Sequence, residues 1–382
     1  MKWNNTNSDC NRKEIIMEFK KYKMEEVATF SQGKQVEIEN QYTEKNENMK
    51  RFLRIIDFTN PNEPIRYVEN FGDRYYATKD DLIMIRYGSQ TCGKVVIGKE
   101  GIIANNMFKI NLNNSLILNR YAYYYLKQDI VYNYLRSSQN SSTIPSINFG
   151  ILNKLEIEVP SIENQRKIIK ILDDIDKKID LNNDINNNLY DKAVALYKNI
   201  FSGIEQGDKT IGEYLTPKRG KNLLTRDANK GNIPVVAGGL EPSTYHNQFN
   251  TQSPVITISA SGANAGYINL WQIPVWASDC SYIDNSITSD VYFWYITLKT
   301  RQKEIYDAQT GSAQPHIYPQ HIANMPISEL NFDKVRDYNN MVEPLFKMIG
   351  SNIKENNWLL ELRDTLLPRL MNGEIDLDKI EI

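Results

Sequence analysis

The sequence of 382 residues contains little cysteine and little histidine. Its three cysteines, Cys10, Cys92 and Cys280, lie far apart and lack the close spacing of a metal site. An odd number of scattered cysteines is typical of a reducing compartment, where disulfides do not persist. Three histidines leave little material for histidine-based catalysis or metal binding. We therefore expect no bound metal and no other cofactor.

Long apolar runs are also missing from the sequence. No segment approaches the roughly 20 apolar residues that a membrane-spanning helix requires. The first residues, MKWNNTNSDCNRKE, are polar and lack the apolar core of a secretion signal. These absences predict a cytoplasmic protein with no membrane partner.

Common catalytic and nucleotide-binding motifs are missing as well. The sequence has no Gly-rich phosphate loop, no GxGxxG after a strand, no GxSxG and no HExxH. It also lacks the Asn-Pro-Pro-aromatic tetrapeptide that amino-methyltransferases use. We therefore expect no catalytic residues and a chain that is not an enzyme. The formal net charge of -2 shows that the whole chain is not strongly basic, as many nucleic-acid-binding proteins are.

An asparagine-rich stretch, DLNNDINNNL at 180–189, stands out from this background. Its composition alone is typical of a solvated linker. The stretch nevertheless lies inside a long pattern with spacings of four and three, which is typical of a helix that packs along one seam. The seam positions are Ile168, Leu172, Ile175, Ile179, Asn182, Asn186, Leu189, Ala193, Leu196 and Ile200.

The same seam recurs 170 residues later in the chain. It has apolar ends, two central asparagines, Asn352 and Asn356, and one charged position, Arg363. Both patterns finish at a glycine, Gly203 or Gly373, the residue type expected just after a helix end. We predict two long helices, a central one over 161–203 and a C-terminal one over 331–373.

The repeat extends into the segments before each helix. SSTIPSINFGILNKLEIEV parallels GSAQPHIYPQHIANMPISE, and the aromatic segment YAYYYL parallels VYFWYI, both at an offset of 170. LIMIRYGSQTCGKVVI aligns with VITISASGANAGYINL, and ANNMFKI with ASDCSYI, at an offset of 173. SQGK resembles PKRGK at an offset of 187. The sequence therefore predicts two mixed α/β domains, 21–160 and 204–330, between an N-terminal tail at 1–20 and a C-terminal tail at 374–382.

This duplicated architecture resembles the specificity subunits of type I restriction-modification systems. The junction VPSIENQRKIIKIL is similar to the Pro-Pro-Leu-x-Glu-Gln-x-x-Ile pattern that opens the central helix in that family. Ser161 replaces the second proline and Asn164 replaces the usual glutamate. Ser161 is a good helix N-cap, and Glu163 still favours the first turn. The residues that fit the pattern are Pro160, Ile162, Gln165 and Ile168.

The resemblance implies an α+β fold in which two long helices form an antiparallel coiled coil and join two repeated target recognition domains. Each domain would read half of a bipartite, asymmetric site in double-stranded DNA. The coiled coil would act as a spacer and as a dock for two methyltransferase subunits. Endonuclease/translocase subunits would join that complex, and the specificity subunit itself would have no catalytic residues.

The four seam asparagines predict how the two helices align. An antiparallel pairing brings Asn182 near Asn356 and Asn186 near Asn352, polar against polar, which costs stability but fixes register. A parallel pairing would also match them, so direction rests on the resemblance. Two independent surface helices are the alternative. Thirty-odd residues at 1.5 Å each give roughly 50 Å, or about 14 base pairs, as the predicted spacer.

We expect DNA contacts from loops, because the strands and aromatic helices are needed for the cores. Arg, Lys, Gln and Asn can read base edges, and Ser can hold phosphates. Each candidate could equally belong to an ordinary solvated loop, and neither domain has a large positive excess, so affinity from phosphate neutralisation should be modest. The candidates are Lys34, Arg86, Gln90, Thr91, Lys94, Ser141 and Ser142 in the first domain, and Lys218, Arg219, Lys221, Ser259, Ser261, Asn264, Ser312, Gln314 and His316 in the second.

Three other functions remain open from the sequence. A self-contained enzyme such as a fused methyltransferase would need a cofactor pocket and a methylating motif. A protein-binding adaptor could use the same duplicated domains without DNA. A relative of the specificity subunits could also serve a different phage-defence complex.

Overall fold

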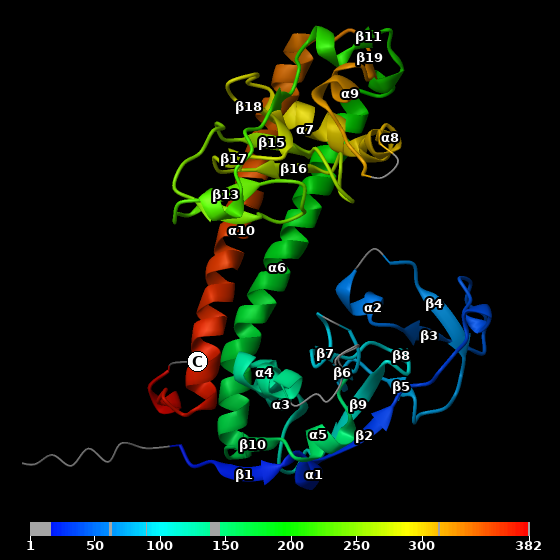
Figure 1. The fold of residues 1–382 in the computed structure, drawn as a ribbon, viewed down its shortest axis with the longest axis vertical. Coiled ribbons are helices and arrows are strands. Elements are labelled where there is room, and N and C mark those ends of the chain that lie inside the picture. Colours follow the sequence, from blue (N-terminus) through cyan, green and yellow to red (C-terminus); the bar gives the residue numbers. More distant parts are fainter. Residues whose placement is uncertain (1–16, 61–62, 89, 138–145, 312–313, 381–382) are drawn as a thin grey trace, which may run out of the picture. The chain divides into compact units, whose positions relative to one another are not determined.

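The structure is a computed structural model that describes residues 17–60, 63–88, 90–137, 146–311 and 314–380 (Figure 1). The chain divides into two compact units. Unit 1 consists of Met1–Lys177 and Leu359–Ile382, and unit 2 consists of Lys178–Trp358. Each unit therefore contains one mixed α/β domain and part of both long helices.

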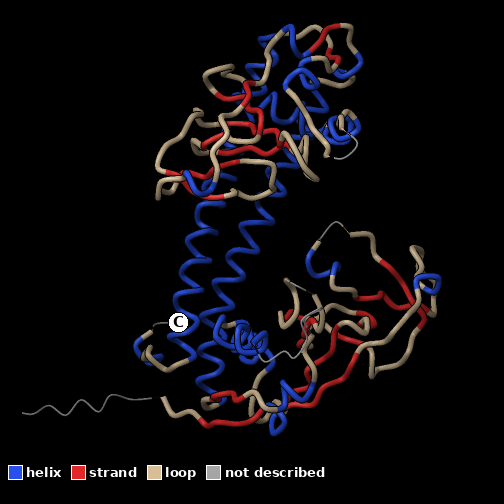
Figure 2. The backbone as a smooth tube through the Cα atoms, viewed as in Figure 1, coloured by secondary structure: helices blue, strands red, loops and turns tan. Residues whose placement is uncertain are grey.

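The two long helices are α6, Ile162–Ile200, and α10, Phe332–Met371. They lie side by side in the backbone view (Figure 2). Within unit 2, Asn182 contacts Asn356 and Asn186 contacts Asn352, so residue numbers rise along one helix as they fall along the other. The prediction of an antiparallel coiled coil is confirmed. Gly203 and Gly373 follow the helix ends with a positive φ of 72°, a conformation that glycine adopts without strain.

Unit 1 is built on two four-stranded sheets and one two-stranded sheet. The first sheet has the order β2 (Ala28–Gln32), β9 (Met107–Leu112), β6 (Leu82–Ile85) and β7 (Val95–Ile97). The second has the order β4 (Arg66–Glu69), β3 (Met49–Leu53), β8 (Gly101–Ile103) and β5 (Tyr76–Ala77). The third pairs β1 (Lys20–Lys23) with β10 (Glu156–Val159). The short helices are α1 (Met24–Val27), η1 (Ile38–Asn40), α2 (Ile56–Thr59), α3 (Asn119–Lys127), α4 (Asp129–Ser137) and α5 (Phe149–Asn153).

Unit 2 repeats this plan. Its four-stranded sheet has the order β12 (Lys218–Arg219), β18 (Cys280–Asp284), β15 (Val255–Ser259) and β16 (Ile268–Trp271). A three-stranded sheet has the order β14 (Thr244–His246), β13 (Ile233–Val236) and β17 (Trp276–Ala277), and a third sheet pairs β11 (Lys209–Thr210) with β19 (Pro326–Ile327). The helices are η2 (Ile204–Gln206), η3 (Ile211–Glu213), η4 (Thr225–Asp227), α7 (Val291–Thr300), α8 (Gln302–Asp307) and α9 (Pro319–Ala323).

The aromatic helices α3 and α7 are core elements of their units. Tyr121 and Tyr124 of α3 are fully buried and share a cluster with Ile168 and Leu172 of α6. In unit 2, α7 buries Phe293 and Trp294 in a cluster that includes residues of both α6 and α10. Burial of large aromatic side chains is a major favourable term in folding. Each domain is therefore attached to its part of the coiled coil through a shared hydrophobic core.

The same glycine turn occurs in both units. Gly93 has a φ of 88° and Gly266 a φ of 86°. A Cβ atom on Gly93 would lie 2.9 Å from Ile147, and one on Gly266 would lie 3.2 Å from Ile317. These glycines differ by 173 in number and the isoleucines by 170, as in the sequence repeat. The internal duplication is therefore also a duplication of tertiary contacts.

The two predicted tails contribute to the core in the residues that the structure describes. Met17 and Leu377 are buried in the core cluster of unit 1. The C-terminal segment forms η5, Leu377–Lys379, after α10. Residues 17–20 and 374–380 therefore pack as part of unit 1. The sequence did not predict this, because short apolar segments at chain ends show no periodicity.

Candidate nucleic-acid interface

Several strands of unit 2 end at one place, which we call the strand-end cluster of unit 2 and define as residues 219–221, 259–262 and 277–280. Strands β15 and β17 finish here, and β18 begins here. The amide of Gly220 donates to the Cys280 carbonyl at 2.8 Å, and the amide of Lys221 donates to the Ala277 carbonyl at 2.9 Å. The Ala260 amide donates to the Asp279 carbonyl at 3.2 Å. Backbone hydrogen bonds thus hold three separate segments together.

The corresponding strand-end cluster of unit 1 consists of residues 32–35, 86–88, 90–94 and 103–107. Here the amide of Gly33 donates to the Met107 carbonyl at 3.1 Å, and the amide of Lys34 donates to the Ile103 carbonyl at 2.7 Å. These two bonds match the two bonds of Gly220 and the residue after it. The SQGK and PKRGK segments, which the sequence related only by weak similarity, therefore occupy the same position in the two units.

A glycine is required at the centre of both clusters. A Cβ atom on Gly33 would overlap the carbonyl oxygens of Ala104 and Ile103. A Cβ atom on Gly220 would overlap the carbonyl oxygens of Ser278 and Ala277. In both cases the obstacle is backbone, which cannot rotate away as a flexible side chain can. The close approach of the first strand to the second sheet thus depends on having no side chain at this position.

An ion pair lies at the surface of the unit 2 cluster. Arg219 Nη2 lies 2.6 Å from Asp279 Oδ1, and the Ser261 hydroxyl donates to the other carboxylate oxygen of Asp279. The Arg219 side chain is 42% exposed and that of Asp279 is 34% exposed, so both reach solvent. Two of the predicted DNA contacts, Arg219 and Ser261, are therefore brought together by a carboxylate that the sequence prediction did not include.

The other predicted contacts of unit 2 differ in their surroundings. Lys218, Lys221 and Gln314 are exposed, and Asn264 is half-buried in the turn that leads to Gly266. Ser259 is the exception: it ends β15, is only 3% exposed, and donates its hydroxyl to the Gly238 carbonyl at 3.0 Å. Ser259 therefore does not lie on a surface loop, because it is the last residue of the buried strand β15.

His316 lies beside the same cluster. It exchanges two backbone hydrogen bonds with Thr310, at 2.8 and 3.1 Å, and forms a β-bridge with Ser261. Its ring stacks on Tyr318 with 5.9 Å between the centroids. The loop on which we predicted Ser312 and Gln314 therefore borders the unit 2 cluster. Ser312 itself, like Ser141 and Ser142 in unit 1, lies outside the described residues.

Two of the three predicted cations of unit 1 lie over aromatic rings. The Lys34 ammonium lies 5.0 Å from the centre of the Phe71 ring, and the Arg86 guanidinium lies 4.9 Å from that of Tyr87. Such cation–π contacts restrain the side chains without neutralising their charge. The other predicted contacts here are Gln90, Thr91 and Lys94: Gln90 and Lys94 are exposed, and the Thr91 hydroxyl donates to the Tyr87 carbonyl at 3.0 Å.

The residues that the sequence prediction missed lie in one segment of each unit. Asp279 of unit 2 aligns with Asn106 of unit 1 in the ASDC and ANNM segments. The Asn106 carbonyl accepts from the Arg86 amide at 2.8 Å, which places Asn106 in the unit 1 cluster. The alignment of these segments was visible in the sequence. Asn106 and Asp279 directly precede β9 and β18, and the loops chosen as candidates did not include them.

Gln165 attaches the aromatic helix of unit 1 to α6. Its side chain is fully buried, accepts from the Leu118 amide at 2.9 Å, and donates to the Leu116 and Pro160 carbonyls at 2.9 and 3.0 Å. Leu118 is the N-cap of α3, so Gln165 supplies the acceptor that this helix end lacks. In unit 2, the Asn339 side chain of α10 accepts from the Tyr292 amide of α7 at 3.1 Å. Gln165, the glutamine of the junction pattern, therefore attaches α3 to α6, and Asn339 attaches α7 to α10 in a similar way.

The asparagines of the coiled coil form a hydrogen-bonded group inside unit 2. Asn182 donates to Asn356 at 2.8 Å and Asn352 donates to Asn186 at 2.8 Å. Asn356 also donates to Asn183 at 2.9 Å. Asn182 and Asn356 are buried, whereas Asn186 and Asn352 are half-buried. The four residues contact as the antiparallel alignment requires, and their role in fixing register stays a prediction.

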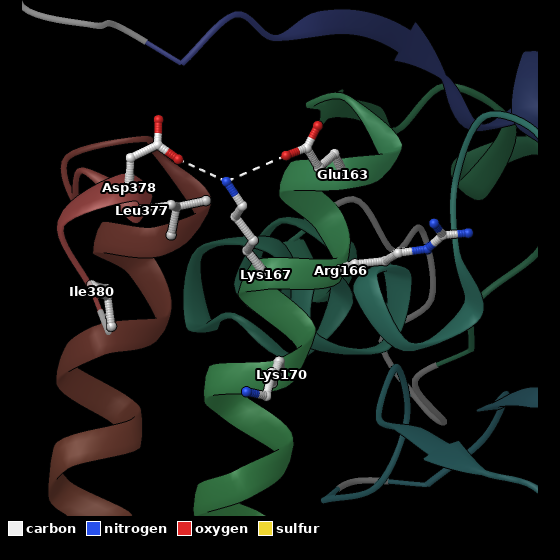
Figure 3. Close-up of a pocket in the computed structure, with 7 residues that line it drawn as sticks. All are labelled: Glu163, Arg166, Lys167, Lys170, Leu377, Asp378 and Ile380. Atoms are coloured by element: carbon white, nitrogen blue, oxygen red, sulfur yellow. Dashed lines mark hydrogen bonds and ion pairs between the residues drawn. The ribbon is translucent and has the colours of Figure 1, made fainter. Parts of the chain in front are cut away.

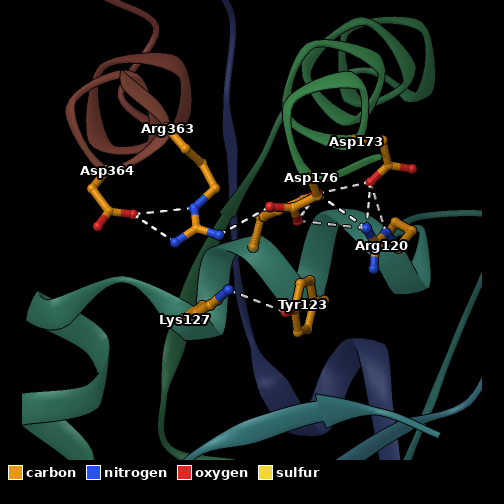
Figure 4. Close-up of polar contacts among 8 residues, drawn as sticks. Arg120, Tyr123, Lys127, Asp173, Asp176, Arg363 and Asp364 are labelled. Atoms are coloured by element: carbon orange, nitrogen blue, oxygen red, sulfur yellow. Dashed lines mark hydrogen bonds and ion pairs between the residues drawn. The ribbon is translucent and has the colours of Figure 1, made fainter. Parts of the chain in front are cut away.

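The part of the coiled coil in unit 1 uses charges instead (Figure 4). Arg363 of α10 lies 2.9 Å from Asp176 of α6, and Arg120 of α3 lies 2.6 Å from Asp173. The Tyr124 hydroxyl donates to both aspartates at 2.8 Å. Burial, together with these two carboxylates, raises the pKa of Tyr124 well above its ordinary value. This network connects α3, α6 and α10 within unit 1.

A shallow groove of about 460 Å³ lies between α6 and the C-terminal segment of unit 1. Lys167 sits between two carboxylates there, 2.7 Å from Asp378 and 3.4 Å from Glu163 (Figure 3). Its hydrogen bond to Asp378 raises the pKa of Lys167. The groove is lined by three cations, Arg166, Lys167 and Lys170, and by the two carboxylates Glu163 and Asp378, so its net charge is small.

Two kinds of feature are absent from the part of the chain that the structure describes. Within it, no three or more His, Cys, Asp or Glu side chains are grouped as a metal site would require. No helix in these ranges is long and apolar enough to span a bilayer.

The architecture is that of two mixed α/β domains on an antiparallel coiled coil, and comparisons with known proteins find the same architecture. The family described as type I restriction modification DNA specificity domain matches residues 17–190. The type I restriction enzyme MjaIX specificity subunit of Methanocaldococcus jannaschii is 26% identical over 329 residues, covering 75% of this chain and 76% of the relative. A putative type I specificity subunit of Mycoplasma genitalium is 24% identical over 326 residues, covering 79% and 84%.

A solved structure shares the fold. The crystal structure of a type I restriction-modification S subunit from M. genitalium superposes with a TM-score of 0.59 and 19% identity, covering 94% of this chain and 97% of the other. The chain is therefore similar to type I restriction-modification specificity subunits, over residues 17–190 by the family match and over most of its length by the two relatives.

Proposed function

We propose that this chain reads a bipartite site in double-stranded DNA for a type I restriction-modification complex. One observation carries this proposal above the others. The same strand-end cluster is built twice, with matching backbone hydrogen bonds at Gly33 and Gly220 and with different side chains around each glycine. A repeated scaffold with variable surface residues suits two sites that recognise two different short sequences.

The chemistry of the two clusters fits the edges and the backbone of DNA. Arg219 and Arg86 present guanidinium groups that can bind base edges or phosphates. Lys34, Lys94 and Lys221 supply charge for phosphate contacts. The chain has 45 basic and 47 acidic residues, so this positive charge is local. We therefore expect modest affinity from the chain alone and tighter binding in the assembled complex.

In this proposal the coiled coil sets the distance between the half-sites. Helix α6 has 39 residues, which gives a length of about 58 Å at 1.5 Å per residue. That length corresponds to about 17 base pairs, somewhat more than one turn of duplex. Removal of seven residues from each helix should shorten the preferred spacer by about three base pairs. An unchanged spacer in such a variant would disprove the spacing role.

The proposal assigns methylation and cleavage to partner subunits. Two methyltransferase subunits would dock on the coiled coil, and endonuclease/translocase subunits would join them. The chain's own residues would bind DNA, hold the two domains in register and take part in no chemical step. Similarity to type I specificity subunits supports this assignment, because a specificity subunit works within such a complex.

Selection from random-sequence duplexes tests the proposal. The chain, assembled with its methyltransferase subunits, should enrich duplexes with two short sequence blocks separated by a spacer of fixed length and free sequence. Assembly with the partner proteins but no enrichment of any DNA sequence would favour a protein-binding adaptor. Enrichment of one continuous block would contradict the two-site reading.

A further inference from the structure

The two strand-end clusters carry different side chains at matching positions. Arg219 comes directly before Gly220, as Gln32 comes before Gly33. Asp279 comes directly before Cys280, and Asn106 before Met107, the residues whose carbonyls accept from those glycine amides. Unit 2 therefore has an arginine and an aspartate where unit 1 has a glutamine and an asparagine.

The strand pairing shows that these positions are equivalent. Arg219 is opposite Ser281 in the β12–β18 ladder, and Gln32 is opposite Phe108 in the β2–β9 ladder. Ser281 and Phe108 lie two residues after Asp279 and Asn106, respectively. The match therefore follows from hydrogen-bonded register in each unit separately, in addition to the sequence alignment.

The charged pair of unit 2, Arg219 and Asp279, has hydrogen-bonding positions left for a ligand. Arg219 uses Nη2 for its contact with Asp279, and a guanidinium has five N–H donors, so others remain for a further partner. Asp279 accepts from Arg219 and Ser261, and a carboxylate has about four acceptor positions. Both side chains are partly exposed, and their mutual contact holds them in defined orientations.

The amide pair of unit 1 contains an unmet hydrogen-bond requirement. The Asn106 side-chain oxygen is buried and has no hydrogen-bond partner among the described residues. Gln32 donates to the Asn105 carbonyl at a long distance of 3.4 Å. Buried polar atoms without partners are rare, and each one calls for an explanation. A donor from a bound molecule would satisfy this oxygen once the Asn106 side chain turned toward solvent, because the atom is closed to solvent here.

We propose that these paired positions determine which base pair each unit prefers, Arg219 with Asp279 selecting G·C and Gln32 with Asn106 selecting A·T. This inference rests on the proposed function and names the residues that carry its specificity. Arginine is matched to the O6 and N7 acceptors of guanine, and aspartate can accept from the N4 amino group of cytosine. One amide of the glutamine–asparagine pair is matched to the N6 and N7 groups of adenine, and the other can donate to O4 of thymine.

An exchange of the pairs tests the inference. The assembled complex would be challenged with random-sequence duplexes, using the wild-type chain, the double variant R219Q/D279N and the reciprocal variant Q32R/N106D. R219Q/D279N should change one position of one half-site from G·C to A·T, by about tenfold or more in preference. Q32R/N106D should change one position of the other half-site in the opposite direction. The spacer and the unaltered half-site should stay the same in both variants.

A matched control removes the same charges elsewhere in unit 2. Lys209 and Glu213 form an ion pair at 3.1 Å, next to the separate β11–β19 sheet. The variant K209Q/E213Q should select the wild-type sequence. A base change with this control would mean that charge in the unit as a whole, rather than the paired positions, sets the preference.

The possible failures are distinguishable. A wild-type complex that enriches no bipartite site contradicts the proposed function itself. Wild-type selection with unchanged bases in both exchange variants overturns only the inference. Loss of all selection with an unchanged melting temperature also overturns it, because the pairs would then hold phosphates. If an exchange variant does not fold, R219K serves instead: it keeps the charge, loses the planar fork, and should lose the G·C preference while still binding DNA.

Discussion

The two units of this molecule share a backbone plan but differ in the polar groups placed on it. At the strand-end clusters, unit 1 has the amides of Gln32 and Asn106 where unit 2 has the charges of Arg219 and Asp279. Along the coiled coil the pattern is reversed, with the ion pair of Arg363 in unit 1 and the amide group of Asn182 in unit 2. Backbone geometry and apolar cores therefore define the repeat, whereas polar side chains distinguish its copies.

Substitution of the equivalent glycine should destabilise each unit in the same way, and this is the largest effect that we expect. Gly33→Ala or Gly220→Ala forces a Cβ atom against backbone carbonyls and should lower the free energy of unfolding of its own unit by about 3 kcal/mol. Denaturant unfolding followed by hydrogen exchange would locate the loss. Gly239→Ala is the matched control, because its Cβ would lie 3.4 Å from the nearest atom, and it should change stability little. Equal stability of Gly220→Ala and the control would show that the close approach is not required.

In the charged part of the coiled coil, loss of one partner of an ion pair should lower stability more than loss of both partners. Arg363→Leu leaves Asp176 partly buried without its closest cation and should destabilise unit 1 by about 2 kcal/mol. The double variant Arg363→Leu with Asp176→Leu should recover part of that loss, because no uncompensated charge remains. Arg369→Leu, at an exposed ion pair on α10, should have little effect. A double variant less stable than the single one would contradict this interpretation.

The amide part should behave in the opposite way. Asn182→Leu with Asn356→Leu replaces two buried, mutually bonded amides by apolar side chains and should raise stability by about 1 kcal/mol while loosening register. Denaturant unfolding would measure the first effect, and hydrogen exchange along α6 and α10 the second. A plain loss of folding would argue against a seam at these positions.

The smallest effect concerns one lysine of unit 2. Burial lowers the pKa of Lys299 to about 8, from 10.5 for an unperturbed lysine. Between these pH values the unfolded chain binds more protons than the folded one, so stability should rise as pH increases from about 8. Lys299→Met should remove this rise and, after allowance for its partial exposure, stabilise unit 2 at pH 7 by about 1 kcal/mol.

A pair of thermal melts at pH 7 and pH 9.5 would check this. Lys127→Met, in the corresponding aromatic helix of unit 1, is the matched control for the loss of a lysine from such a helix. A wild-type unit 2 whose stability does not rise over this range would contradict the assignment to Lys299.

The sequence predicted the parts of the fold that depend on periodicity and repetition. The long helices, the aromatic helices and strands such as LIMI follow from spacing and from the offset near 170, because burial of one face imposes a regular pattern. The three-stranded sheet of unit 2 and the packing of Met17 and Leu377 were not predicted. The strands of that sheet are only two to four residues long. Met17 and Leu377 lie near the chain ends, and neither place is long enough for a period to develop.

For the candidate site, the sequence indicated which segments lie together but not the surroundings of their side chains. Arg219, Ser261 and His316 meet in one cluster, as three sequence segments that align with unit 1 should. Asp279 and Asn106, which directly precede β18 and β9, were missed, and Ser259 was included although it is buried. Sequence similarity showed which segments meet, but not which of their side chains face solvent.

Mapping of methylated sites in the genome of cells that express the chain with its methyltransferase subunits tests the central claim most directly. For the wild-type chain we expect one asymmetric, bipartite methylated motif with an unread spacer of constant length. When seven residues are removed from each long helix, we expect a shorter spacer between the same half-sites. A continuous motif, or a spacer that does not respond to helix length, would contradict the account.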